Sequence, residues 1–145
     1  MPVTGIAQME RDLTVFASVT VPEQVYKRVE RVANAVLDGI VSRTPVDTGL
    51  ARGNWQPTYS VPASGPTEFK DRQPLGAPPS AITKARLAAA LQAFKAGGLT
   101  GTIYITNRLK YILALEHGHS RSQAPFGMVD RTVGELKQRF ATYVR

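Results

Sequence analysis

The chain has 145 residues, of which 43% are hydrophobic and 20% are charged, and its formal net charge is +7 at pH 7. This length fits one domain over residues 1–145, and the composition differs from that of disordered and membrane-spanning chains. No cysteine is present, which excludes disulfides, thiol catalysis and thiolate metal ligands.

The first twenty residues carry two competing patterns. Ile6, Met9, Leu13 and Phe16 fall at helical spacing, whereas every second residue from Leu13 to Val19 is apolar, as in a strand. Both interpretations stay open. The segment lacks the basic start and apolar block of a secretory signal. We therefore expect a soluble protein that stays in the cytoplasm where it is made.

The next element is predicted to be the main core helix. Thr20 can cap its start, Pro22 suits its first turn, and Glu23 can complete a capping box. Gly39 weakens the helix slightly and allows a close contact. One apolar stripe should face a sheet or another helix. It consists of Val25, Val29, Val32, Ala33, Val36, Leu37 and Ile40.

A specified turn follows this helix. Pro45 lacks an N–H donor and disfavours a helical backbone at Thr44, so the helix should end near there. Asp47 and Thr48 can hydrogen-bond local amides, and Gly49 can adopt a backbone conformation that a β-carbon resists. We predict a structural turn built on Pro45, Asp47, Thr48 and Gly49.

An edge strand and a long proline-rich segment are predicted next. Apolar and polar residues alternate from Trp55 to Val61, and Pro57 confines this strand to a sheet edge. Six prolines between Gly53 and Ser80 argue against continuous helix or sheet. We interpret residues 56–80 as a loop or arm that orders on a neighbouring subunit, with a mobile surface loop as the alternative.

Regular elements resume at Ser80, which can cap a helix that Gly97-Gly98 ends. Residues 99–106 are typical of a strand, residues 111–115 of a helical turn or strand end, and residues 128–143 of a last helix. The expected fold class is α+β, with long amphipathic helices packed on a small antiparallel sheet.

Three short motifs follow one another along the chain. The first is the Pro45–Gly49 turn after a helix, the second lies within Asn107–Gly118, and the third is Ala124–Val129. Together they resemble the neck, or tail-completion, proteins of tailed bacteriophages, which include tail components similar to minor tail protein Z. In the second motif Ile112 stands where alanine is usual. The resemblance spans about residues 21–145, without a counterpart for residues 54–80.

The resemblance implies a structural virion protein that forms a homo-oligomeric ring in the neck, joining head and tail, or at the head-proximal end of the tail. Its partners would be neighbouring connector and tail proteins. Glu116 and Gly118 would shape a turn, with Arg52 or Arg121 as a partner of Glu116. Aromatic residues and arginine dominate buried contacts. On this basis the interface candidates are Trp55, Tyr59, Arg72 and Phe126.

The excess positive charge lies beyond residue 43. Residues 1–43 carry five basic and five acidic side chains, whereas residues 48–111 carry eight basic and two acidic ones. Such a region is either a solvated face or one that meets DNA phosphates or an acidic partner. The candidate contacts are Arg52, Lys70, Arg72, Lys84 and Arg86. The alternative function is a small basic DNA-binding protein that acts through electrostatic phosphate contacts; in a virion, the contact with packaged DNA would be non-specific.

No set of residues indicates catalysis. Asp47-Thr48-Gly49 spells the aspartic-protease tripeptide, but it follows a helix end instead of an apolar strand, so a protease is the weakest hypothesis. His117 and His119 lack a carboxylate at an established metal-ligand spacing. We expect no enzyme activity, no cofactor, no metal and no membrane partner.

Overall fold

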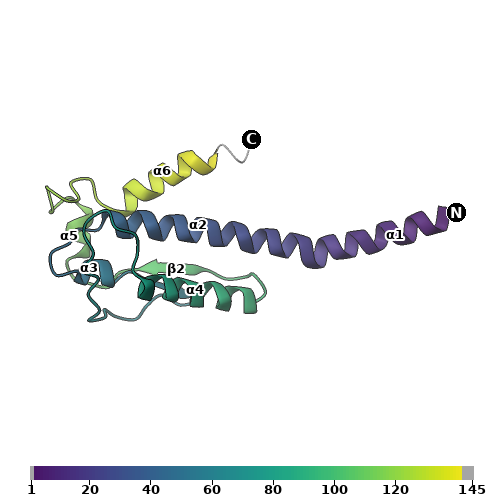
Figure 1. The fold of residues 1–145 in the computed structure, drawn as a ribbon, viewed down its shortest axis with the longest axis horizontal. Coiled ribbons are helices and arrows are strands. Elements are labelled where there is room, and N and C mark those ends of the chain that lie inside the picture. The colour runs from purple at the N-terminus through teal and green to yellow at the C-terminus, as the bar shows by residue number, and fades with distance from the viewer. Residues whose placement is uncertain (1, 142–145) are drawn as a thin grey trace.

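A computed structural model describes residues 2–141. The chain begins as one helical rod that joins α1 (Pro2–Val15), a π-helical turn η1 (Phe16–Thr20) and α2 (Val21–Arg43). Figure 1 shows that α1 extends away from the rest of the molecule, whereas the far end of α2 lies among the other elements. The helical interpretation of the first twenty residues is therefore confirmed for the described part.

α2 has the predicted bounds, but the predicted cap is absent at Thr20. Its backbone is already helical, with φ −69° and ψ −46°, and its side chain makes no capping hydrogen bond. Instead the N–H of Val21 bonds to the carbonyl of Phe16, five residues earlier. This wider π-turn gives the ring of Pro22 room, so the helix continues through a proline that would ordinarily break it.

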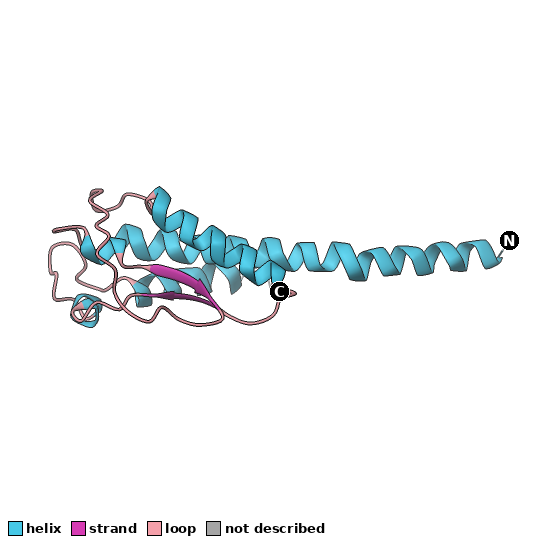
Figure 2. Cartoon of the chain, turned by 90° about the horizontal axis from the view of Figure 1, so that it is seen from below, coloured by secondary structure: helices cyan, strands magenta, loops and turns pink. Residues whose placement is uncertain are grey.

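Two short strands and four further helices complete the described chain. β1 (Gln56–Tyr59) and β2 (Ile103–Thr106) form an antiparallel sheet in which Gln56 faces Thr106 and Tyr59 faces Ile103. The helices are α3 (Leu50–Gly53), α4 (Ala81–Ala96), α5 (Ile112–Glu116) and α6 (Val129–Ala141). In Figure 2 the two strands lie among helices at one end of the molecule, while the N-terminal helix extends away from them. The α+β prediction is confirmed.

Local signals placed several of these boundaries. Ser80 accepts a hydrogen bond from the Thr83 N–H at 3.3 Å and so caps α4. The edge strand forms within narrower bounds than predicted, with Pro57 opposite Ile105. The last helix is described as far as Ala141, and the remainder of its predicted span lies outside the described residues.

The core sits where α2 meets the sheet, α4 and the start of α6. Its buried side chains include Leu37, Ile40, Val41, Trp55, Leu87, Leu91 and Met128. Gly39 brings α2 close to α6, because a methyl group at this position would overlap Cγ2 of Thr132. The close contact expected at Gly39 is therefore present.

Residues 60–80 contain no helix or strand, yet they are held by their own chain. The Asn54 side chain exchanges two hydrogen bonds with the Thr67 backbone, at 2.7 and 2.9 Å. The Gly76 N–H donates to the Ser42 carbonyl at 2.9 Å. These hydrogen bonds join the segment to its own subunit, so they do not support the interpretation of an arm that orders only on a neighbour.

Candidate functional site

A row of exposed apolar side chains runs along α1 to the start of η1. Ile6, Met9, Leu13 and Phe16 are between 53% and 57% exposed, and they are three, four and three residues apart. That spacing places all four side chains on one face of the helix. Among the described elements, the substantial contacts of α1 are with η1. The face is therefore a candidate interface that the chain itself leaves open.

The π-turn carries this apolar face onto α2. From Phe16 the next apolar position in line is Val21, five residues on, and the backbone hydrogen bond between these two residues closes the π-turn. Because a π-helical turn spans that interval, Val21 lies above Phe16 instead of rotating away from it. Phe16, Val21 and Val25 line one hollow of about 520 Å³. The apolar stripe is thus continuous across the turn.

A second hollow of about 680 Å³ follows along α2, between β2 and α6. Val25 and Arg28 line both hollows, so the two lie next to each other along α2. The walls of the second hollow are mainly apolar and come from α2, from the end of α4, from β2 and the chain before it, and from α6. They include Val29, Val32, Val36, Leu99, Ile103 and Val133. We call these two hollows the α2 groove.

In the Pro45–Gly49 turn, Thr48 and Gly49 have the roles that the sequence predicts. Thr44 is extended, with φ −72° and ψ 127°, and ends α2. Thr48 Oγ1 accepts a hydrogen bond from the Leu50 N–H at 3.3 Å. Gly49 has φ +87°, and a β-carbon there would overlap the Asp71 carbonyl. Burial and, to a lesser extent, the Asp47 carboxylate raise the pKa of Tyr111.

Arg52 is buried, which corrects its assignment as a DNA contact. Its guanidinium is fully covered. It donates to the carbonyls of Val41, Ala77 and Pro78 at 2.9–3.0 Å, and its Nη2 lies 3.3 Å from Asp71 Oδ2. Arg52 therefore fastens the end of α2 to the proline-rich segment and cannot reach a phosphate. No local sequence pattern indicates the pairing of Arg52 with Asp71.

The other basic candidates fall into two groups. Lys70, Arg72 and Lys84 are exposed and stay candidates for DNA or an acidic partner. Arg86 is partly buried, donates to the Gly53 carbonyl at 2.9 Å, and lies 5.3 Å from the ring centroid of Phe69. Its guanidinium is engaged within the chain, so a role in phosphate binding is not supported.

The interface candidates also divide by burial. Trp55 is 4% exposed and its Nε1 donates to Thr44 Oγ1 at 2.8 Å, so it is a core residue and its assignment to an interface is corrected. The Tyr59 hydroxyl donates to the Thr100 carbonyl at 2.7 Å. Arg72 is exposed and Phe126 is 73% exposed. Arg72 and Phe126 stay interface candidates.

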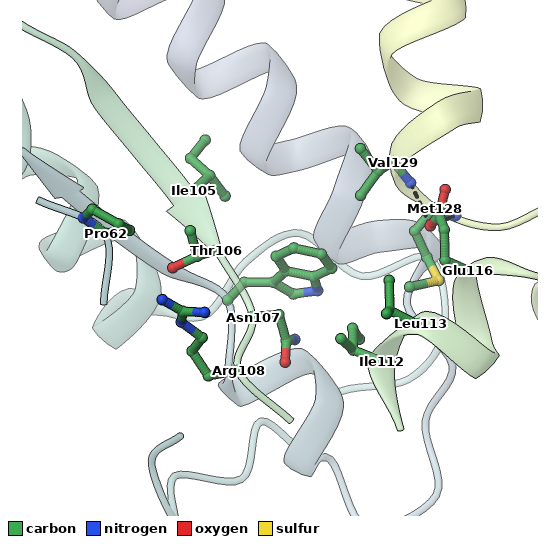
Figure 3. Close-up of a pocket in the computed structure, with 11 residues that line it drawn as sticks. Pro62, Ile105, Thr106, Asn107, Arg108, Ile112, Leu113, Glu116, Met128 and Val129 are labelled. Carbon is green, nitrogen blue, oxygen red and sulfur yellow. Dashed lines mark hydrogen bonds between the residues drawn. The ribbon is translucent and has the colours of Figure 1, made fainter. Parts of the chain in front are cut away.

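Glu116 caps α6. The predicted pairing of Glu116 with Arg52 or Arg121 is not present. Its carboxylate accepts hydrogen bonds from the N–H groups of Met128, Val129 and Asp130 at 2.8–2.9 Å. Figure 3 shows Glu116 beside Met128 and Val129. Burial alone would raise the pKa of Glu116, but these three hydrogen bonds and the nearby His117 lower it below its usual range.

Next to Glu116 is a pocket of about 420 Å³ (Figure 3). Its apolar walls include Trp55, Ile105, Ile112, Leu113 and Met128. The charged groups at its edge are engaged, because Glu116 caps α6 and Arg108 Nε donates to the Ala63 carbonyl at 2.8 Å. The described lining has no paired nucleophile and base. This pocket can receive an apolar group but has no evident chemistry.

Within residues 2–141, no group of three His, Asp or Glu side chains could hold a metal ion. None of the described helices is both long and apolar enough to cross a membrane. No family model matches the chain, and no curated protein or solved structure matches it. Its functional surfaces must therefore be judged by their own chemistry.

Sequence reasoning noted Ile6, Met9, Leu13 and Phe16 as one of two patterns, but it did not identify them as an interface. The signal was present in their spacing. The continuation of this stripe onto α2 at Val25 could not be predicted, because the five-residue step from Phe16 to Val21 departs from α-helical periodicity.

Proposed function

We propose that the protein is a structural virion component of a tailed phage. It forms a homo-oligomeric ring in the neck, completing or joining head and tail, or at the head-proximal end of the tail. It is made in the cytoplasm of the bacterial host and contacts neighbouring connector and tail proteins. The proposal is supported by the three motifs that resemble neck proteins and by the exposed apolar face of α1.

The observation that carries the proposal is that face. Four large apolar side chains, each more than half exposed, lie in line on a helix that extends from the body. Contiguous exposed apolar surface on a protein usually marks an interaction site. The α2 groove is a second and different apolar surface. Two different surfaces on one chain allow head-to-tail association, which gives a ring when the rotation between copies closes and an open filament when it does not.

Electron microscopy of the purified full-length chain tests this function. We expect closed rings with one subunit number. Particles no larger than single chains, at every concentration and salt level tried, would contradict a self-assembling ring.

A second candidate function is electrostatic DNA binding, supported by the net charge of +7 and by the exposure of Lys70, Arg72 and Lys84. Duplex affinity should then fall steeply with added salt. Replacing all three side chains with glutamine should reduce the slope of log affinity against log salt by roughly three. An unchanged slope would show that these side chains do not contact phosphates.

A further inference from the structure

We propose that the apolar face of α1 from one copy seats in the α2 groove of a second copy. This inference rests on the proposed self-assembly and specifies its two contact surfaces. The face consists of Ile6, Met9 and Leu13 on α1 together with Phe16 at the start of η1, and the groove runs along α2 from Val21 towards Ile40. Each copy gives one helix and receives another.

The chain cannot fill its own groove with α1. The two helices are parts of one rod, and η1 keeps their apolar stripes on the same side. Figures 1 and 2 show the rod extended in two perpendicular views. Bringing α1 back over α2 would require breaking the helix at η1. The occupant must therefore come from another molecule.

The two surfaces match in length. Along an α-helix each residue rises about 1.5 Å, so the stripe from Ile6 to Phe16 is about 15 Å long. The wall that α2 gives to the second hollow runs from Val25 to Ile40, which is about 22 Å by the same rise. The α1 stripe therefore fits within this part of the groove, and its side chains recur at the spacing that packs into another helix.

The two surfaces also match in charge. At 3.6 residues per turn, Glu10 and Asp12 lie on either side of the α1 stripe, while Arg11 points to the opposite face. In the groove Arg28 lines both hollows and Arg31 lines the one nearer η1. Among the described residues that line them, neither hollow has an acidic side chain. The acidic side chains beside the α1 stripe of one copy would thus lie near the basic side chains of the groove in the next copy.

The same charges argue against pairing α1 with α1. A two-fold contact between the stripes of two copies would bring the acidic flanks, Glu10 and Asp12, towards their counterparts. Insertion into the groove places them near Arg28 instead. Insertion of α1 into the groove is therefore favoured over pairing of the two stripes.

Photocrosslinking tests the contact without assuming a register. p-Benzoylphenylalanine at position 13, on the stripe, should form an adduct between copies whose peptide maps to the groove, at residues 21–40, 99–105 or 129–133. The same group at position 11, on the opposite face, is the matched control and should give no groove adduct. An adduct from position 13 to α1 of another copy would overturn the proposal and indicate stripe-to-stripe pairing.

A charge variant provides the second measurement. Leu13→Glu places a carboxylate in the apolar contact and should weaken self-association about tenfold or more. Arg11→Gln lowers the net charge by the same amount on the opposite face and should leave self-association unchanged. Equal effects from both variants would overturn the proposal, because the effect would then follow net charge and not the apolar face.

Ring formation by the wild type, read by electron microscopy, separates the two claims. Rings without a groove adduct would overturn this contact and leave the proposed function standing. A groove adduct between copies that never form rings would support the contact and contradict the ring. Absence of both would contradict both.

Discussion

At the scale of single residues, Arg52 holds together segments that are far apart in sequence. Its buried guanidinium joins the end of α2, the segment near Pro78 and the carboxylate of Asp71. Removing one partner of a buried ion pair leaves an uncompensated charge. The free energy of unfolding should therefore depend strongly on this pair.

Asp71→Asn should lower the free energy of unfolding by about 3 kcal/mol, because it leaves Arg52 charged and buried without a carboxylate. Urea unfolding measures this change. The neighbouring exposed Arg72→Gln is the control and should stay within about 0.5 kcal/mol of wild type. Equal effects of the two variants would show that the ion pair is not a central support of the fold.

Glu116 gives α6 a pH-dependent cap. Its folded-state pKa is lowered, so its contribution is present above the pKa of the unfolded chain and is lost as the pH falls through the folded-state pKa. Glu116→Gln should cost about 1 kcal/mol of unfolding free energy at neutral pH. In acid, below the usual glutamate range, wild type and variant should converge. A constant difference across urea titrations at both pH values would contradict this role.

At the scale of elements, Gly39 sets the distance between α2 and α6. Gly39→Ala gains helix propensity, but its methyl group overlaps Cγ2 of Thr132, so we expect a net loss of about 1–2 kcal/mol. Adding Thr132→Ser removes that methyl group, keeps the hydroxyl, and should restore part of the loss. Thermal unfolding of both single variants and the double variant measures the coupling; additive effects would contradict a direct contact.

The π-turn sets the direction of the α1 stripe. Deleting Ala17 should replace the π-turn with an α-helical turn and rotate Leu13 by about 100° relative to Val25. Self-association should fall, while the unfolding free energy changes little, because α1 has its substantial contacts with η1 among the described elements. Deleting Val3, ahead of the stripe, keeps its register and is the control. Loss of self-association in both deletions would show that helix length, and not stripe direction, matters.

The elements that the sequence predicted correctly have local causes. Ser80 caps α4 through a residue three positions away, and Pro45 ends α2 through its own ring. The predictions fail where a distant residue or an unusual turn determines the local structure. The buried Arg52 pairs with the carboxylate of Asp71, which lies 19 residues further along the chain. No local sequence pattern indicates that contact. No sequence pattern predicts the π-turn at Phe16 either, since it adds only one residue to an otherwise regular helix.

The sequence also predicts part of the candidate site. The spacing of Ile6, Met9, Leu13 and Phe16 indicated a helical face, but only the fold shows that this face is left open. The α2 groove combines residues from three helices and β2. Such a surface depends on tertiary arrangement, so sequence periodicity could show one of its walls and not the others.

At the scale of the whole molecule, the chain is a body with a projecting helix (Figure 1). The body has a buried core of its own and a polar clamp at Arg52. The projecting helix has apolar side chains that only another molecule can cover. In the proposed assembly, the body supplies the groove and the helix supplies the connection to the next copy.

The most direct test is the mass of the full-length protein by light scattering across concentration, for wild type and for Leu13→Glu. The account predicts that wild type reaches a defined multiple of the chain mass, and that the variant needs a higher concentration to do so. A wild-type mass that stays at one chain, or an identical concentration dependence in both proteins, would contradict the claim that the apolar face of α1 drives assembly.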